Sequence, residues 1–159
     1  MIAALLFVVS VHALYKIDIQ MAGRAPKAKD WEELAFQEYA TRLRGIIQLD
    51  TKYYKTGIAL EKNLNLDGSL MAPLICLDPT GQSFDSIAFS EMLFQQLDAH
   101  GSRLTIGIGP AEGFSSKVRQ TAYCVSLSKL TFPHQLVRVI LAEQIYRASE
   151  IRRDSKYNK

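Results

Sequence analysis

Residues 126–148 read SLSKLTFPHQLVRVILAEQIYRA, and this stretch decides how the last third of the chain folds. Small hydroxyl residues lead into Pro133 and His134, and apolar residues at helical spacing follow them. The spacing predicts a long helix over about residues 133–152. A plain structural helix does not need such an entry, whereas a loop that must hold a polar ligand beside a helix start does.

Towards the amino terminus, short apolar strands alternate with helices. The expected strands are residues 15–21, 46–54, 73–78, 103–108 and 123–127, and the expected helices are residues 31–44, 59–64, 86–100, 115–122 and 133–152. Asp30 and Glu33 have the spacing of a capping box. Residues 67–68 and 79–81 are expected to turn the chain. The alternation predicts an α/β fold with a mostly parallel sheet, and the length predicts a single domain.

Three loops follow expected strands, at residues 78–81, 109–113 and 127–132. In parallel sheets, ligands bind outside the carboxyl ends of the strands. Gly109 and Gly113 permit a close approach of backbone to a ligand, although a plain strand-to-helix turn explains them equally well. The hydroxyls of Ser126, Ser128 and Thr131 can bond a ligand or cap the helix that follows.

Few side chains in this region suggest chemistry. His134 is a candidate acid or base, or a structural histidine at the mouth of a helix. Glu143 and Arg147 lie four residues apart and can pair along the helix, as a simple salt bridge or subunit contact or as part of a site. The chain lacks a GxSxG elbow, a GxGxxG fingerprint and a Walker lysine, which disfavours serine hydrolases and nucleotide-binding oxidoreductases.

The composition is that of an ordinary soluble globular protein. Of 159 residues, 48% are hydrophobic and 22% are charged, and the formal net charge of +3 only leans towards a polyanionic partner. Cys76 and Cys124 stand in apolar surroundings without a CxxC pair, which favours two buried thiols. The spacing of histidines, cysteines and acids suggests no metal site.

Basic residues gather on and after the last helix. Phosphate contact and base stacking are plausible roles for a tail of this kind, although such tails are also often only solvated. The candidate RNA-binding residues are Arg138, Arg152, Arg153, Lys156 and Tyr157.

Residues 1–14 carry no acidic or basic side chain, and residues 2–11 are nearly all apolar. The run is short for a membrane span, and it has no positively charged start. A secretory or plastid-type targeting leader, a mis-annotated start codon and an extra buried strand all remain open. We therefore set residues 1–14 apart from a single domain over residues 15–159.

Together, the run from Ser126 to Ala148 and the preceding loop with Gly109 and Gly113 resemble the RlmH-type 23S ribosomal RNA pseudouridine N3-methyltransferases of bacteria. These proteins belong to the SPOUT class. The similarity covers residues 15–159 and is densest over residues 104–148. It implies a SPOUT-type α/β knot, with a trefoil knot in the carboxyl-terminal part, and methyl transfer from S-adenosyl-L-methionine to N3 of a pseudouridine.

The resemblance also assigns residues and partners. It implies cofactor binding by Leu77, Gly109, Leu127, Ser128, Lys129, Leu130, Thr131 and Phe132, largely through backbone groups. His134 and Glu143 are the candidate proton acceptors. The substrate would be ribosomal RNA on the assembled ribosome or its large subunit, and the protein would be a homodimer without membrane contact. The location would be cytoplasmic, or organellar, in a plastid or mitochondrion, if residues 1–14 are a targeting signal.

Two residues depart from that family pattern. Pro110 stands where a second glycine is usual, and it lacks a backbone N–H. Asn158 stands where a histidine is usual, although its amide can still hydrogen-bond. These departures keep open a second hypothesis, a non-catalytic member of the fold that binds RNA or the ribosome.

Overall fold

A computed structural model describes residues 14–64, 66 and 73–158. The elements in chain order are β1 (Tyr15–Ala22), α1 (Trp31–Arg42), β2 (Ile47–Tyr54), α2 (Gly57–Asn63), β3 (Leu74–Ser83), α3 (Ser86–Ala99), β4 (Arg103–Ile108), α4 (Ser116–Thr121), β5 (Tyr123–Ser126) and α5 (His134–Arg152). The expected leader at residues 1–14 lies outside the described residues except for Leu14, as does the expected turn at residues 67–68.

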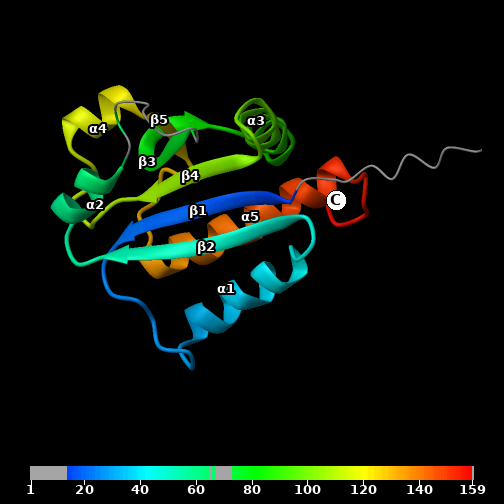
Figure 1. The fold of residues 1–159 in the computed structure, drawn as a ribbon, viewed down its shortest axis with the longest axis horizontal. Coiled ribbons are helices and arrows are strands. Elements are labelled where there is room, and N and C mark those ends of the chain that lie inside the picture. Colours follow the sequence, from blue (N-terminus) through cyan, green and yellow to red (C-terminus); the bar gives the residue numbers. More distant parts are fainter. Residues whose placement is uncertain (1–13, 65, 67–72, 159) are drawn as a thin grey trace, which may run out of the picture.

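The described strands form one five-stranded sheet in the order β2-β1-β4-β3-β5 (Figure 1). Every neighbouring pair of strands in it is parallel. Parallel neighbours require crossover connections, and here α1, α2, α3 and α4 supply them. The α/β class with a parallel sheet is therefore confirmed, while the trefoil knot stays a prediction.

The main core lies between one face of the sheet and α1, α3 and α5. Ile17, Ile19 and Ile106 from the sheet are at most 1% exposed there, and α3 and α5 contribute buried residues such as Leu93 and Leu141. A smaller cluster lies on the other face, where α2 packs over the carboxyl ends of β1 and β2, and α4 packs over β3. Burying both faces of β3 and β4 explains why their sequences are nearly continuous apolar runs.

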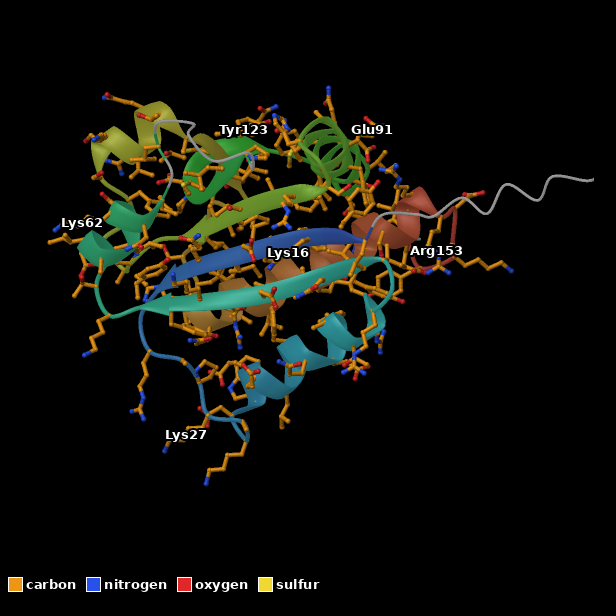
Figure 2. All side chains as sticks on the ribbon, in the orientation of Figure 1. Lys16, Lys27, Lys62, Glu91, Tyr123 and Arg153 are labelled. Atoms are coloured by element: carbon orange, nitrogen blue, oxygen red, sulfur yellow. The ribbon has the colours of Figure 1, made fainter. Side chains whose placement is uncertain are left out.

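Before the carboxyl ends that α2 covers, the second face of β1 and β2 is open to solvent and polar (Figure 2). Lys16 lies on it and forms ion pairs with Asp18 at 3.5 Å and with Asp50 at 3.2 Å. The alternating sequence of residues 15–21 predicted a strand, and alternation of this kind is what a half-covered strand requires.

The expected turn at residues 79–81 is wrong, because β3 continues through it to Ser83. The strand bulges between Leu77 and Gln82 and then pairs with β5 again. Asp78 holds the bulge, since its Oδ1 accepts hydrogen bonds from the Thr80 N–H at 2.8 Å and the Thr80 hydroxyl at 2.6 Å. A Cβ on Gly81 would stand 2.6 Å from the carbonyl carbon of Cys124, so only glycine fits where the two backbones approach.

The expected capping box at the start of α1 is also wrong. Asp30 precedes the helix, but its carboxylate accepts from the Lys27 N–H at 2.8 Å rather than from α1. Glu33 instead reaches across to α5, where its Oε2 lies 2.7 Å from Nη2 of Arg138.

Arg138 is 1% exposed, so its expected contact with RNA phosphate is a further correction. Its guanidinium lies 4.2 Å from the centre of the Phe36 ring and is fully enclosed between α1, β2 and α5. The sequence does not reveal that Arg138 is buried, because an exposed arginine on an amphipathic helix also has apolar sequence neighbours.

Cys76 and Cys124 are free thiols and sit opposite each other on β3 and β5. Cys76 is buried as expected, and that burial raises the pKa of its thiol, whereas Cys124 is only partly covered. Among the described residues no helix has the length and apolar character needed to cross a membrane.

The buried pair of Glu33 and Arg138 yields a stability prediction. Glu33→Ala leaves a buried guanidinium without its carboxylate, and we expect the free energy of unfolding to fall by about 3 kcal/mol. Equilibrium denaturation in urea measures this. Glu38→Ala is the matched control, because Glu38 pairs with Arg42 on the exposed face of the same helix and should matter little.

The pair also predicts an acid dependence. Burial acts to raise the pKa of Glu33, but hydrogen bonds from Gln37 and Arg138 hold it below the ordinary value. The stabilisation is therefore present at neutral pH and is lost as the pH falls through that lowered pKa. A Glu33→Ala variant whose stability declined between pH 6 and pH 3 (about the range where carboxylates titrate) as steeply as the parent's would contradict this assignment.

Candidate functional site

The carboxyl ends of β3, β4 and β5 meet at one edge of the sheet. Leu77 on β3 pairs in register with Ile108 on β4 and with Val125 on β5. Gly109 follows Ile108 directly, and Leu127 comes two residues after Val125. The structure thus brings together the β3 bulge at residues 78–81 and the loops after β4 and β5, and the edge they form is the candidate site.

The loop after β4 is shaped by glycines and one aromatic ring. A Cβ on Gly109 would meet the Phe114 ring at 3.1 Å, and one on Gly107 would meet it at 3.2 Å. Phe114 is 3% exposed, so its buried ring supports this backbone from below. The Gly113 N–H donates to the Pro110 carbonyl at 2.9 Å, and Gly113 has a φ of +81°, which favours glycine.

The hydroxyls of the loop after β5 serve the loop itself. Ser126 Oγ donates to the Ser128 carbonyl at 3.1 Å, and Ser128 Oγ accepts from the Leu130 N–H at 3.0 Å. In the described structure α5 begins after Pro133 without a side-chain cap, so the helix-capping role considered for these hydroxyls is wrong. Leu130 is left 69% exposed beside Lys129 and Thr131, which are also exposed.

The two candidate proton acceptors lie apart on α5. His134 is the first residue of the helix and borders the loop after β5. Glu143 is nine residues further on, about 13 Å along the axis at 1.5 Å per residue. Within one chain the two side chains cannot act on the same atom.

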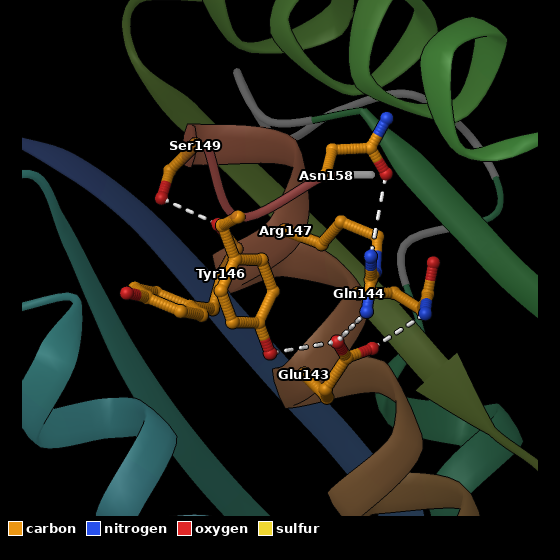
Figure 3. Close-up of polar contacts among 7 residues, drawn as sticks. Glu143, Gln144, Tyr146, Arg147, Ser149 and Asn158 are labelled. Carbon is orange, nitrogen blue, oxygen red and sulfur yellow. Dashed lines mark hydrogen bonds and ion pairs between the residues drawn. The ribbon is translucent and has the colours of Figure 1, made fainter. Parts of the chain in front are cut away.

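Glu143 instead organises the carboxyl-terminal tail (Figure 3). Its Oε1 accepts hydrogen bonds from Arg147 Nη2 at 2.7 Å and from the Tyr157 hydroxyl at 3.1 Å. Arg147 also donates to Oδ1 of Asn158 at 3.3 Å and stacks 4.9 Å from the Tyr157 ring. Partial burial, with the nearby Glu143 carboxylate, raises the pKa of Tyr157 to about 12, so its hydroxyl remains a donor at neutral pH.

The remaining candidate RNA-binding residues lie in or near this tail, and they differ in their exposure and in their ion pairs. Arg152 pairs with Asp98 at 3.1 Å and lies over the Phe94 ring at 4.3 Å. Arg153 pairs with Glu150 at 3.0 Å, but more than half of its side chain is exposed. Lys156 is exposed. Tyr157 is only partly exposed, and its ring packs on Tyr146 at 4.9 Å.

The two groups of candidates occupy opposite ends of the sheet. At the start of α5, Gln135 donates to the carbonyl of Arg24, just beyond the carboxyl end of β1. At its end, Arg152 stacks on Tyr15, the first residue of β1. Because α5 has 19 residues, these ends are about 28 Å apart. Arg152 and Arg153 therefore lie far from the loops at the carboxyl edge, whereas Tyr157 folds back along α5 as far as Glu143, about 13 Å along the axis from His134.

Two surface hollows lie elsewhere in the described structure. One, of about 520 Å³, is lined by Ile87, Phe94 and Ile151 between α3 and the end of α5. The other, of about 280 Å³, lies between α1 and the start of β2, beside Leu14. Neither touches the loops at the carboxyl edge, so we assign the candidate site from strand register and loop geometry.

Sequence reasoning missed Phe114 and the full extent of the Glu143 network. Phe114 sits in an unremarkable stretch after Gly113, and only the fold shows that its ring supports Gly107 and Gly109. The Glu143–Arg147 pair was visible from its spacing, but the tail's return to it depends on the reversal at Asp154, where φ is +53°.

Comparison with known proteins gives a consistent picture. Residues 15–158 match the model of a family described as predicted SPOUT methyltransferases. A protein of Protochlamydia amoebophila named ribosomal RNA large subunit methyltransferase H is 40% identical over 146 residues, covering 92% of this chain and all of that protein. Proteins of the same name from Mesoplasma florum and Oleidesulfovibrio alaskensis are 36% and 35% identical, covering 79% and 89% of this chain and 88% and 97% of those proteins.

The tail network predicts a local change without unfolding. Glu143→Ala removes the common acceptor of Arg147 and Tyr157, so we expect faster amide hydrogen exchange at residues 155–158. The midpoint of thermal unfolding should move by only a few degrees. Hydrogen exchange read by mass spectrometry measures this, and Glu143→Gln, which keeps an acceptor oxygen, should change exchange less. Unaltered tail exchange in Glu143→Ala would show that Glu143 does not hold the tail.

Proposed function

The chain belongs to the SPOUT methyltransferase family, and from this premise we propose that it methylates ribosomal RNA of the large ribosomal subunit with S-adenosyl-L-methionine as methyl donor. The observation that carries the proposal is the meeting of the β3 bulge with the loops after β4 and β5 at one edge of the sheet. The relatives named as methyltransferases match the chain over most of its length.

The residues at this edge fit a bound nucleoside with a charged amino-acid part. Leu77, Leu127 and Leu130 present apolar surface from two of the loops, and Leu130 is 69% exposed. Gly109 has no side chain, so its backbone groups are accessible to a ligand. The proposed cofactor residues are the eight implied by the sequence: Leu77, Gly109, Leu127, Ser128, Lys129, Leu130, Thr131 and Phe132.

The methyl sulfonium of the cofactor supplies an activated methyl group, so the protein's main task is alignment. We propose N3 of a pseudouridine as the acceptor, and this nitrogen must lose its proton. His134 is the better placed proton acceptor in the same chain, since it borders the loop after β5. Glu143 accepts hydrogen bonds on both oxygens, which suits it to orienting Arg147 and Tyr157.

Exposed cations at both edges of the sheet can bind RNA phosphate. Lys129 is exposed in the loop after β5, and Lys27 and Lys29 are exposed in the loop after β1. Arg153 and Lys156 are exposed at the other edge, and Figure 2 labels Lys27 and Arg153. The net positive charge is small, which suits a protein that recognises the shape of folded ribosomal RNA more than its total charge.

We also propose that the working form is a homodimer. The tail folds back only as far as Glu143, about 13 Å along α5 from His134, so in the dimer we propose, a second copy brings its tail closer to the cofactor edge. The apolar residues Val139 and Ile145 of α5 are in the core and are not available to an interface. Trp31 and Leu34 on α1 are each 59% exposed and offer the interface a more accessible apolar surface.

A non-catalytic, ribosome-binding role is the second candidate. Its support is Pro110, which offers no N–H to a ligand in the loop after β4, and Asn158, which replaces the histidine usual in this class. Ribosome association without methyl transfer would favour it.

The first test is cofactor binding followed by methyl transfer. Calorimetry with the purified protein should detect S-adenosylhomocysteine at micromolar to millimolar concentration, and labelled methyl should pass to ribosomes that lack the modification. Gly109→Arg should abolish both, because a side chain at residue 109 would collide with the buried Phe114 ring and displace the backbone of the cofactor edge. Circular dichroism must show that this variant is folded, since Phe114 lies beneath residue 109. Absence of binding to the parent protein at millimolar ligand would end the enzymatic proposal.

The second test addresses the composite site. Gly109→Arg disables the cofactor edge, and deletion of residues 157–159 removes the end of the tail, so each variant alone should be inactive. When the two variants are refolded together, each heterodimer contains one intact cofactor edge facing one intact tail. Half of the dimers should be mixed, and each of these has one working site of two, so we expect about a quarter of the parent activity to return. Inactive mixtures that nevertheless form dimers would show that tail and cofactor edge do not cooperate between chains.

A further inference from the structure

The loop after β4 is held at both ends by α2, a helix some fifty residues earlier in the chain. α2 begins at Gly57, and Gly57 and Glu61 are four residues apart, on the same face of the helix. Gly57 lies against Pro110 at the start of the loop, and Glu61 bonds Ser115 at its end. The two contacts span residues 110–115, which contain Gly113 and directly follow Gly109.

The contact at Gly57 leaves no room for a side chain. A Cβ built on Gly57 would lie 2.6 Å from Cγ of Pro110 and 3.3 Å from its Cβ and Cδ. Gly57 needs no left-handed backbone in this structure, since its φ lies outside the positive range. The reason for glycine at this position is therefore the proline ring.

The contact at Glu61 is polar. Its Oε1 accepts the Ser115 N–H at 2.7 Å, and Ser115 in turn caps α4 through its hydroxyl, which accepts from the Val118 N–H. One helix turn further on, Leu64 reaches the backbone at Gly107, where its Cδ2 would be 3.6 Å from an added Cβ. The same face of α2 thus contacts β4, the loop after it and the start of α4.

We propose that α2 positions the loop Gly109–Ser115 for the cofactor, with Gly57 and Pro110 acting as a matched pair. The inference rests on the proposed function, since it concerns how that site is held. Pro110 replaces a flexible residue in the loop, and Gly57 provides the space that its ring needs. The pair fixes the loop in one conformation before the cofactor arrives, which reduces the entropy lost on binding.

A double-mutant cycle tests the pair. We compare Gly57→Ala, Pro110→Gly and the double variant with the parent, measuring the Kd of S-adenosylhomocysteine by calorimetry at a temperature where circular dichroism shows each to be folded. Gly57→Ala should weaken binding about tenfold, because the new methyl group displaces the loop. Pro110→Gly should weaken it about threefold through loss of preorganisation. The double variant should return to the Pro110→Gly value, since glycine at 110 leaves room for alanine at 57.

A second pair of variants tests the polar contact with a conservative control. Glu61→Ala removes the acceptor for the Ser115 N–H and should weaken binding about threefold, whereas Glu61→Gln keeps an acceptor oxygen and should stay close to the parent. Ile58→Ala is the matched control in α2, because Ile58 is 71% exposed and should leave the Kd unchanged.

The outcomes separate a positioning role from a structural one. If the folded Gly57→Ala protein bound like the parent while only its melting temperature fell, α2 would be ordinary packing and the inference would be overturned. Failure of Pro110→Gly to rescue Gly57→Ala would overturn it as well. If the parent protein bound no S-adenosylhomocysteine, the proposed function and this inference would both be overturned. If the parent bound normally but Gly57→Ala bound equally well, or Pro110→Gly failed to rescue it, only the inference would be overturned.

Discussion

The antiparallel return of α5 along the whole sheet is the constraint from which the rest of the arrangement follows. Gln135 ties its start to the backbone beyond β1, and Arg152 ties its end to Tyr15 at the beginning of β1. Between them, the buried Arg138 is clamped by Glu33 of α1. Because α5 is anchored at both ends and near its start, the helix cannot slide, and the loop before it stays at the opposite edge of the sheet from Arg152 and Arg153.

Most strands and helices could be predicted from the sequence because hydrophobic spacing and strand-like or helix-like composition agreed with one another. Alternation in residues 15–21 predicted a strand, and the apolar run at residues 103–108 matched a fully buried one. All five helices of the described structure were expected, with bounds close to those observed. Placing the loops at strand ends was then enough to predict that they meet, since parallel strands share a carboxyl edge.

The failures have a common physical origin in contacts between distant segments. Residues 79–81 have the composition of a turn, yet pairing with β5 draws them into a bulged strand that ends at Ser83. Arg138 looked like a surface cation because its partner, Glu33, is 105 residues away. No local pattern distinguishes a paired, buried arginine from a solvated one, since the difference lies in desolvation that only the fold imposes. Likewise, the hydroxyls of Ser126 and Ser128 were expected to bind a ligand or to cap the helix, and the capping alternative fails because both hydroxyls form hydrogen bonds within the loop.

The same reasoning changes how Pro110 is judged. Taken alone, proline in the loop after β4 is a loss, because it removes an N–H and restricts the backbone. In the fold its ring lies against a residue without a side chain, and Glu61 secures the far end of the same loop. A rigid residue is costly only where the surrounding structure demands another shape, and here the surroundings are complementary to it. The departure from the family pattern is therefore better understood as one half of a pair than as damage to the site.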